Sequence, residues 1–240
     1  MIIHEVDAGE FRVRSALIRG ARHHLVWDTL THPDDMAAFA GICEGSPSLV
    51  VYSHADWDHI QGTSAFASPL IIAHRESVKR FQTDAPAALA DMRAAHPGRW
   101  DAVRLMAPDI TFDGSLDLDL GGVTVCLRPL PGHTPDSAVA FVPELNLLLA
   151  GDTVELPCPC VPRGCDLEAW MEELERWRSN PRVRTVIPSH GPCGDGEVIA
   201  QTIAYLDGLR RGSPPTPPAD APPFYAATHL ENLRNCIPSR

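Results

Sequence analysis

The stretch Ser53-His54-Ala55-Asp56-Trp57-Asp58-His59 directly follows the apolar run Leu49-Val50-Val51-Tyr52. It places two histidines and two aspartates within six residues, at the end of a predicted buried strand. Packing so many polar and charged side chains together is costly unless a cation compensates them, and imidazole and carboxylate groups are common metal ligands. The stretch therefore predicts a metal site at this strand end.

Three further segments end a strand-like run with a tight turn and a ligand-type residue. They are Pro131-Gly132-His133-Thr134-Pro135, Ala150-Gly151-Asp152-Thr153 and Pro188-Ser189-His190-Gly191. The apolar runs before them, at 123–127, 145–149 and 183–187, have the composition of strands. Four strand-end loops can converge on one edge of a sheet, where a rigid scaffold carries functional side chains.

In this order, the four segments resemble the metallo-β-lactamase fold superfamily, whose pattern is His-x-His-x-Asp-His, then Gly-His, Gly-Asp and a late His. The resemblance covers roughly residues 1–211 and implies an α/β fold, a four-layer αββα sandwich. Val26-Trp27-Asp28-Thr29-Leu30 is similar to the family's early Asp-Thr-Gly strand end, with Leu30 in place of glycine. A second departure is Asp56, which stands where the family has its second histidine.

The resemblance also implies a ligand set for two metal ions. Seven residues match the family's ligand positions: His54, Asp56 and His133 for one ion, Asp58, His59 and His190 for the other, and Asp152 as the bridge. Water shared by two divalent cations loses its proton near neutral pH and becomes a hydroxide nucleophile. Asp58 is the predicted catalytic residue, because it can orient this hydroxide or transfer its proton. The predicted activity is hydrolysis of a small organic ester, thioester or lactone.

Asp56 replaces a neutral imidazole with a carboxylate and makes the predicted centre more negative. An oxygen-richer site favours manganese or iron over zinc, so the predicted cofactors are two divalent ions, zinc or else manganese or iron. A carboxylate at this position also resembles the di-iron domain of flavodiiron oxygen and nitric-oxide reductases. Those proteins carry a flavodoxin domain, for which this chain has neither the length nor a flavin-phosphate loop. A redox domain of that type is the alternative function, and a metal-binding homologue without catalysis is the third.

Composition limits the other classes of function. A chain of 240 residues with 44% hydrophobic content can bury one substantial core. The formal charge of −11 disfavours nucleic-acid and anionic membrane partners. Acidic residues near the N-terminus argue against a signal peptide, and no apolar run is long enough for a membrane span. We therefore predict a cytoplasmic protein that acts on a small molecule.

The seven cysteines are an odd number, which cannot all pair within a monomer and favours a reducing compartment. Three of them, Cys158, Cys160 and Cys165, cluster in a proline-rich loop after Asp152. The cluster could form a soft-metal site or a redox-sensitive lid, but a structural zinc site needs a fourth ligand that is not evident. A stiff loop with partly buried thiols is therefore favoured.

The remaining periodicity predicts strands at 11–18 and 24–28 and two core-facing helices over 167–177 and 198–209. After Gly212 the proline-rich run Ser213-Pro214-Pro215-Thr216-Pro217-Pro218 cannot continue a helix. Residues 212–240 are therefore predicted as a proline-rich C-terminal arm, extended over 213–218 and separate from the 1–211 domain. Its apolar side chains either pack on that domain or reach a second copy and form a homodimer.

Overall fold

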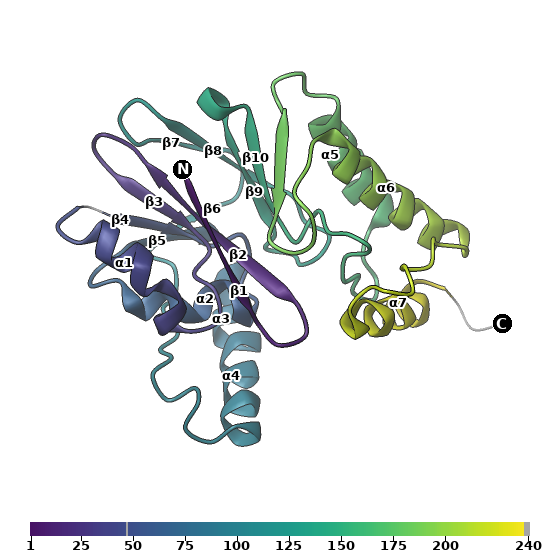
Figure 1. The fold of residues 1–240 in the computed structure, drawn as a ribbon. Helices are drawn as coiled ribbons and strands as arrows, with labels where there is room; N and C mark the ends of the chain where they lie inside the picture. Colours follow the sequence, from purple (N-terminus) through teal and green to yellow (C-terminus); the bar gives the residue numbers. More distant parts are fainter. Residues whose placement is uncertain (47, 238–240) are drawn as a thin grey trace.

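Within residues 1–46 and 48–237, which the computed structural model describes, two β-sheets pack face to face between two layers of helices (Figure 1). The first sheet has the order β1 (Ile2–Asp7), β2 (Arg12–Arg19), β3 (His24–Trp27), β4 (Ser48–Val51), β5 (Leu70–His74), β6 (Ile110–Phe112). The second has the order β11 (Thr185–Pro188), β10 (Leu147–Gly151), β9 (Ala138–Val142), β8 (Thr124–Pro129), β7 (Leu116–Asp119).

Strand directions decide where the loops emerge. Strands β3 to β6 run parallel, and β10 runs parallel to β11. Strands β8 and β10 are both antiparallel to β9, so they share a direction. Two backbone hydrogen bonds join the edges of the sheets: Ala138 N donates to Ser53 O at 2.8 Å, and Arg14 N donates to Ser189 O at 3.0 Å. The loops after β4, β8, β10 and β11 therefore meet at one edge of the sandwich.

The helices cover the outer faces of the two sheets (Figure 1). On the side of the first sheet lie α1 (Ala37–Cys43), α2 (Trp57–Ile60), α3 (Ser77–Gln82) and α4 (Asp84–Ala95), with the short 3-10 helices η1 (Pro33–Met36) and η2 (Gln61–Ala65). On the side of the second sheet lie α5 (Leu167–Arg178) and α6 (Gly196–Arg211), and the 3-10 helix η3 (Pro143–Leu145) precedes β10.

Three apolar layers hold these elements together. Trp27 and Leu149 belong to the layer between the sheets. Phe39 of α1 belongs to the layer between the first sheet and its helices, and Trp170 of α5 belongs to the layer between the second sheet and its helices. Burial of apolar area on both faces of each sheet stabilises the stack. The predicted four-layer αββα sandwich is confirmed.

The C-terminal arm contains a helix that the sequence did not indicate. Helix α7 (Pro223–Cys236) begins at a proline, a residue suited to the first turn of a helix, and lies beside α6 (Figure 1). Its inner face buries Thr228, His229 and Asn232, so its sequence carries only a weak apolar period. The arm packs on the body of its own chain. A homodimer formed through it stays a prediction.

The sequence reading also missed β1, whose first residues Ile2 and Ile3 are exposed and show no alternation of burial. The strand is recognisable only through its antiparallel pairing with β2. Over the described ranges, every helix falls short of the length or the apolarity that a membrane crossing requires.

Candidate metal centre

The seven residues predicted as ligands form one cluster at the edge where the strand-end loops meet. Four follow β4 and the others follow β8, β10 and β11, in this order: His54, Asp56, Asp58 and His59, then His133, Asp152 and His190. Six of them are buried, and the side chain of Asp56 is 30% exposed. Segments far apart in the chain therefore place their polar groups together inside the protein.

Two of the predicted glycine–ligand pairs need glycine for space. A Cβ atom on Gly132 would lie 2.2 Å from the ring of Trp170, and one on Gly151 would lie 2.9 Å from the side chain of Ser53. Gly151 also has a φ of 55°, in the left-handed region. These close approaches let the backbone turn sharply and direct His133 and Asp152 into the cluster.

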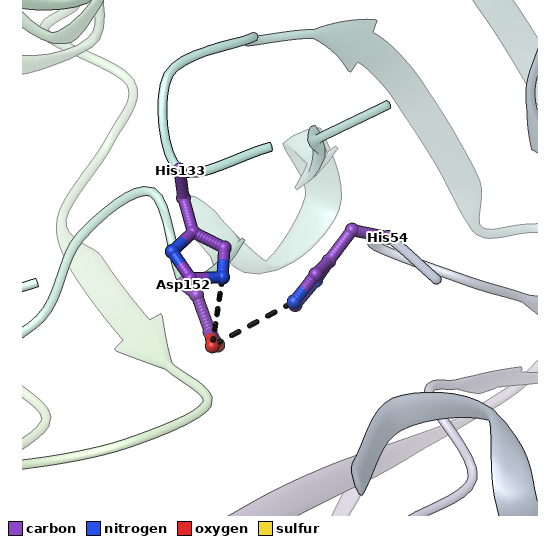
Figure 2. A group of neighbouring side chains, drawn as sticks. All are labelled: His54, His133 and Asp152. Atoms are coloured by element: carbon purple, nitrogen blue, oxygen red, sulfur yellow. Dashed lines mark ion pairs between the residues drawn. The ribbon is translucent and has the colours of Figure 1, made fainter. Parts of the chain in front are cut away.

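Asp152 lies at the centre of this cluster, and Figure 2 shows His54 and His133 converging on it. Its Oδ2 atom lies 3.2 Å from Nε2 of His190 and 3.7 Å from Nε2 of both His54 and His133. Its Oδ1 atom lies 3.4 Å from Nε2 of His59. One carboxylate therefore faces four imidazoles, which arrive from three different loops.

The ring orientation of two of these histidines is fixed by backbone carbonyls. Nδ1 of His133 lies 3.0 Å from the carbonyl oxygen of Cys160, and Nδ1 of His190 lies 2.8 Å from that of Arg12. A carbonyl oxygen can only accept, so each Nδ1 carries the hydrogen and donates it. In the neutral ring Nε2 then keeps its lone pair, directed at the cluster, as metal-binding histidines require.

Side chains orient the other two histidines. Nδ1 of His59 donates to Oδ2 of Asp28 at 2.9 Å, and Nδ1 of His54 lies 2.9 Å from Oγ of Ser53. Asp28 is fully buried and also accepts from N of Ser53 at 2.7 Å. The aspartate of the early strand end therefore supports the ring of His59 from behind the cluster.

Several buried atoms of the cluster lack a partner, and they are the atoms that a cation would need. Nε2 of His54, Nε2 of His59 and Oδ1 of Asp152 make no hydrogen bond within the described part of the chain. Burying unpaired polar atoms is costly, and coordination of a cation removes this cost. Two triads present ligand atoms within 4.8 Å of one another: His54, His133 and Asp152, and Asp58, His59 and His190. The triads contain six of the seven predicted ligand residues: Asp152 belongs to the first, and Asp56 belongs to neither.

The aspartates and histidines of the cluster shift one another's pKa values. Burial opposes charge on Asp152, but His190, His59 and His54 hold its pKa well below the usual range. Burial likewise acts to lower the pKa of His190, but Asp152 outweighs it and raises that pKa well above the ordinary value. Protons and a cation would therefore compete for the same imidazole nitrogens.

Asp56 has a partner that the sequence did not indicate. Its Oδ2 atom lies 3.3 Å from Nε2 of His54 and 3.2 Å from Nε2 of His133, while Oδ1 accepts from the guanidinium of Arg80. Arg80 also pairs with the fully buried Asp136 at 2.9 Å and with Asp84 at 3.0 Å. Three carboxylates share this guanidinium, so it offsets only part of the negative charge that Asp56 adds.

The sequence reading missed Arg80 and Asp136, and it left Asp28 and Phe11 without a role at the site. Asp28 follows an apolar run, as the ligands do, and this was the one usable local signal. Arg80 lies on α3, and Phe11 lies in the β1–β2 turn with its ring centroid 4.8 Å from that of His190. Helix and turn positions of this kind carry no pattern of their own.

The three cysteines of the proline-rich loop are wholly or partly buried, which agrees with the favoured loop of partly buried thiols. Burial raises the pKa of the Cys158 thiol to about 12 and that of Cys165 to about 11. Such thiols are poor nucleophiles and poor metal ligands at neutral pH. Among the described residues, none of the loop's three cysteines belongs to a group that could hold a metal ion.

The metal-free protein should lose stability as the pH rises. Burial opposes charge on His133, but Asp56 and Asp152 raise its pKa from 6.5 to about 9. The folded state therefore holds a proton that the unfolded state releases, and this contribution is complete below pH 6.5 and lost as the pH passes about 9. Burial also raises the pKa of Glu155, from 4.5 to about 7, which acts in the same direction.

Thermal melts of stripped and metal-loaded protein between about pH 6 and about pH 9 test this expectation. The melting temperature of the stripped protein should fall across the range. The increase in melting temperature that added metal produces should become larger as the pH rises, because metal and protons compete for the same imidazoles. The expectation would be contradicted if the melting temperature of the stripped protein rose with pH and the increase produced by metal stayed constant.

A cavity of about 920 Å³ adjoins the cluster. It lies between the β1–β2 turn, the loop around Leu156, the backbone at Gly191 and the start of α7. Phe11, Phe224 and Tyr225 supply its aromatic walls, and the rings of Phe11 and Phe224 lie 4.8 Å apart. Because Phe11 also contacts His190, the cavity adjoins the second group of ligand residues.

An αββα sandwich whose strand-end loops carry two adjoining groups of imidazole and carboxylate ligands defines a class of metal-binding proteins. The model of the metallo-beta-lactamase superfamily matches residues 8–194, and the chain belongs to this family. The family resemblance seen in the sequence is thereby confirmed.

Curated relatives in the family act on different substrates. The chain is 27% identical over 218 residues to a linear primary-alkylsulfatase of Pseudomonas sp. (strain ATCC 19151), covering 71% of this chain and 40% of the relative. It is 30% identical over 122 residues to a hydroxyacylglutathione hydrolase of Anaeromyxobacter dehalogenans (strain 2CP-C), covering 51% of this chain and 38% of the relative. The chain thus spans well under half the length of these two proteins.

Among solved structures, an archaeal metallo-beta-lactamase superfamily protein from Sulfolobus tokodaii superimposes with a TM-score of 0.67 at 16% identity. The match covers 98% of this chain and 97% of the archaeal protein. At this identity the similarity establishes the fold alone.

Proposed function

We propose that this chain is a metal-dependent hydrolase that binds two divalent cations and cleaves a small organic ester, thioester or lactone. The observation that supports it most is the position of Asp152, whose carboxylate lies within 3.7 Å of Nε2 of four histidines. All four rings use Nδ1 for other partners, so four Nε2 atoms remain for cations. Membership of a superfamily that includes hydrolases supports the reaction class.

When bound, the cations supply a hydroxide nucleophile from water near neutral pH and polarise the substrate oxygen. The chain's own contribution to proton transfer is assigned to Asp58. Its Oδ2 atom lies 3.3 Å from Nε2 of His190 and its Oδ1 atom 3.6 Å from Nε2 of His59. A buried carboxylate in this position can accept the proton of the attacking water and pass it to the leaving group.

The cavity beside the cluster supports an organic substrate with an apolar part. Phe11, Phe224 and Tyr225 offer aromatic surface, and Leu156 and Pro157 add apolar surface. Contact with such walls contributes binding free energy in proportion to the apolar area removed from water. This favours an acyl or aryl substituent over a fully hydrophilic substrate.

The proposed metals are manganese or iron in preference to zinc. Asp56 contributes a carboxylate oxygen next to His54 and His133, where an imidazole would make a softer site. Arg80 offsets part of the negative charge of Asp56 and leaves its oxygen donor in place. The preference therefore rests on ligand type, and Asp56→His should shift it toward zinc.

The carboxylate of Asp56 also supports a second candidate function, a di-iron redox domain that reduces oxygen or nitric oxide. Such a centre uses a carboxylate beside histidines, and Asp56 lies within 3.3 Å of Nε2 of both His54 and His133. The hydrolase remains the first choice, because the redox reaction also needs an electron donor.

An activity panel on stripped protein reloaded with zinc, manganese or iron tests the proposed function. We expect hydrolysis of at least one ester, thioester or lactone without an added reductant, and higher turnover with manganese or iron than with zinc. Asp56→His, reloaded in the same way, should reverse the ranking of the metals. Oxygen consumption with a reductant, combined with no hydrolysis in the panel, would instead favour the di-iron redox domain.

A further inference from the structure

The C-terminal arm begins after residue 212, beyond the part of the chain that matches the family model. Its helix α7 nevertheless places polar side chains against the body of the protein. Thr228, His229 and Asn232 are all buried there. Polar groups on the inner face of a helix are costly unless they make specific hydrogen bonds, so their partners indicate what the helix holds in place.

Asn232 is 1% exposed, and both ends of its amide are bonded. Its Oδ1 atom accepts from the backbone N of Val161 at 2.8 Å. Its Nδ2 atom donates to the carbonyl oxygen of Pro159 at 2.8 Å and to Oη of Tyr205 at 3.1 Å. These bonds fix the backbone on both sides of Cys160.

The residue between these two anchor points touches the cluster directly. The carbonyl oxygen of Cys160 accepts from Nδ1 of His133 at 3.0 Å, and this bond directs Nε2 of His133 toward the cluster. On the arm side, Sγ of Cys160 lies 3.9 Å from Oγ1 of Thr228. A series of buried and partly buried contacts therefore runs from α7 through the proline-rich loop to one predicted ligand.

We propose that Asn232 is a positioning residue for His133 and that the arm is thereby a structural part of the metal centre. This proposal rests on the proposed metal binding. A ligand whose ring is pre-oriented loses less conformational freedom when the cation binds, which increases the affinity. Asn232 orients the ring of His133 indirectly, by holding the Cys160 carbonyl in line with Nδ1 of His133.

The chemistry at position 232 requires an amide. One oxygen must accept from the N–H of Val161, while the neighbouring atom must donate to the carbonyl of Pro159. Asn232→Leu keeps a similar volume but leaves both backbone groups unpaired. Asn232→Asp keeps the acceptor but turns a second oxygen toward the Pro159 carbonyl. Either change should let the loop move away from His133.

The test measures the affinity of each metal-binding event in the full-length, stripped protein, by titration with Co²⁺ against a competing chelator. His133→Ala identifies the event that depends on His133, because that event is lost in this variant. In Asn232→Leu and Asn232→Asp the same event should weaken roughly tenfold, and its visible absorption band should change. The affinity of the second binding event should stay within about twofold of wild type, because the Cys160 carbonyl supports His133 and not the ligands of that event.

Leu233→Ala is the matched control, because Leu233 packs on the same core from the same helix. If it weakens the first event as much as Asn232→Leu does, general docking of the arm is responsible and the assignment to Asn232 is wrong. Wild-type affinities in both Asn232 variants would also overturn it. If Asn232→Leu does not fold, Asn232→Asp alone decides. A wild-type protein that bound no cobalt would reject the proposed metal centre itself.

Discussion

Asp152→Ala should bind neither cation stably and should lose turnover by on the order of a thousandfold or more. Among the residues that the structure describes, its carboxylate alone lies near Nε2 of all four histidines in the cluster. Without it the four imidazoles no longer share a negative partner, and bound cations would lack their bridge. Loss of the metals would remove several kcal/mol of transition-state stabilisation, which corresponds to roughly a thousandfold decrease in turnover.

Metal content and thermal stability should change together in this variant. A ligand that binds the native state alone raises the melting temperature, so wild type should gain stability on reloading and Asp152→Ala should not. Asp91→Ala is the matched control, because Asp91 is exposed on α4. A variant that kept two equivalents of metal and most of its turnover would show that Asp152 does not bridge.

Asp58→Asn should keep the fold and much of the metal while lowering turnover by about a hundredfold or more. The amide has nearly the shape of the carboxylate and can still offer one oxygen to the second group of ligands. It cannot accept a proton, and the loss of a positioned proton-transfer group costs on the order of a hundredfold or more. The measurement is kcat at matched metal content, with substrate and metal taken from the wild-type panel.

The outcome separates proton transfer from metal binding. If kcat falls only in proportion to lost metal, Asp58 acts as a ligand and nothing more. If kcat at full metal content stays within about threefold of wild type, the proton passes through another group. Glu155 would then be the next residue to change, because it is buried near Asp152 and burial raises its pKa to about 7.

The positions of the predicted ligand residues follow from the sequence, because each lies on a loop or short helix that begins after a strand ends. A strand end is a local pattern: an apolar run, a glycine or small residue, and then a polar side chain. Gly132 and Gly151 add a steric reason, since a side chain at either position would meet Trp170 or Ser53. The same runs predict only a chain of mixed strands and helices, and the four-layer arrangement came from the family resemblance.

The residues that support the ligands could not be found in this way. Arg80 meets Asp56 across 24 residues, and Asn232 meets Val161 across 71. No local periodicity encodes such pairs, because they form only when the fold brings distant segments together. Helix α7 was missed for a related reason. Its buried face is partly polar, and only the bonds of Asn232 and its neighbours explain why that face is inside.

The metal content of the wild-type protein is the most direct test of the proposed binuclear centre. Protein purified without chelators, and then reconstituted with manganese, iron or zinc, should hold about two equivalents of metal per chain by elemental analysis. His133→Ala and His190→Ala should each reduce that content toward one equivalent. Wild-type protein that holds less than about half an equivalent of any transition metal after reconstitution would contradict the binuclear centre.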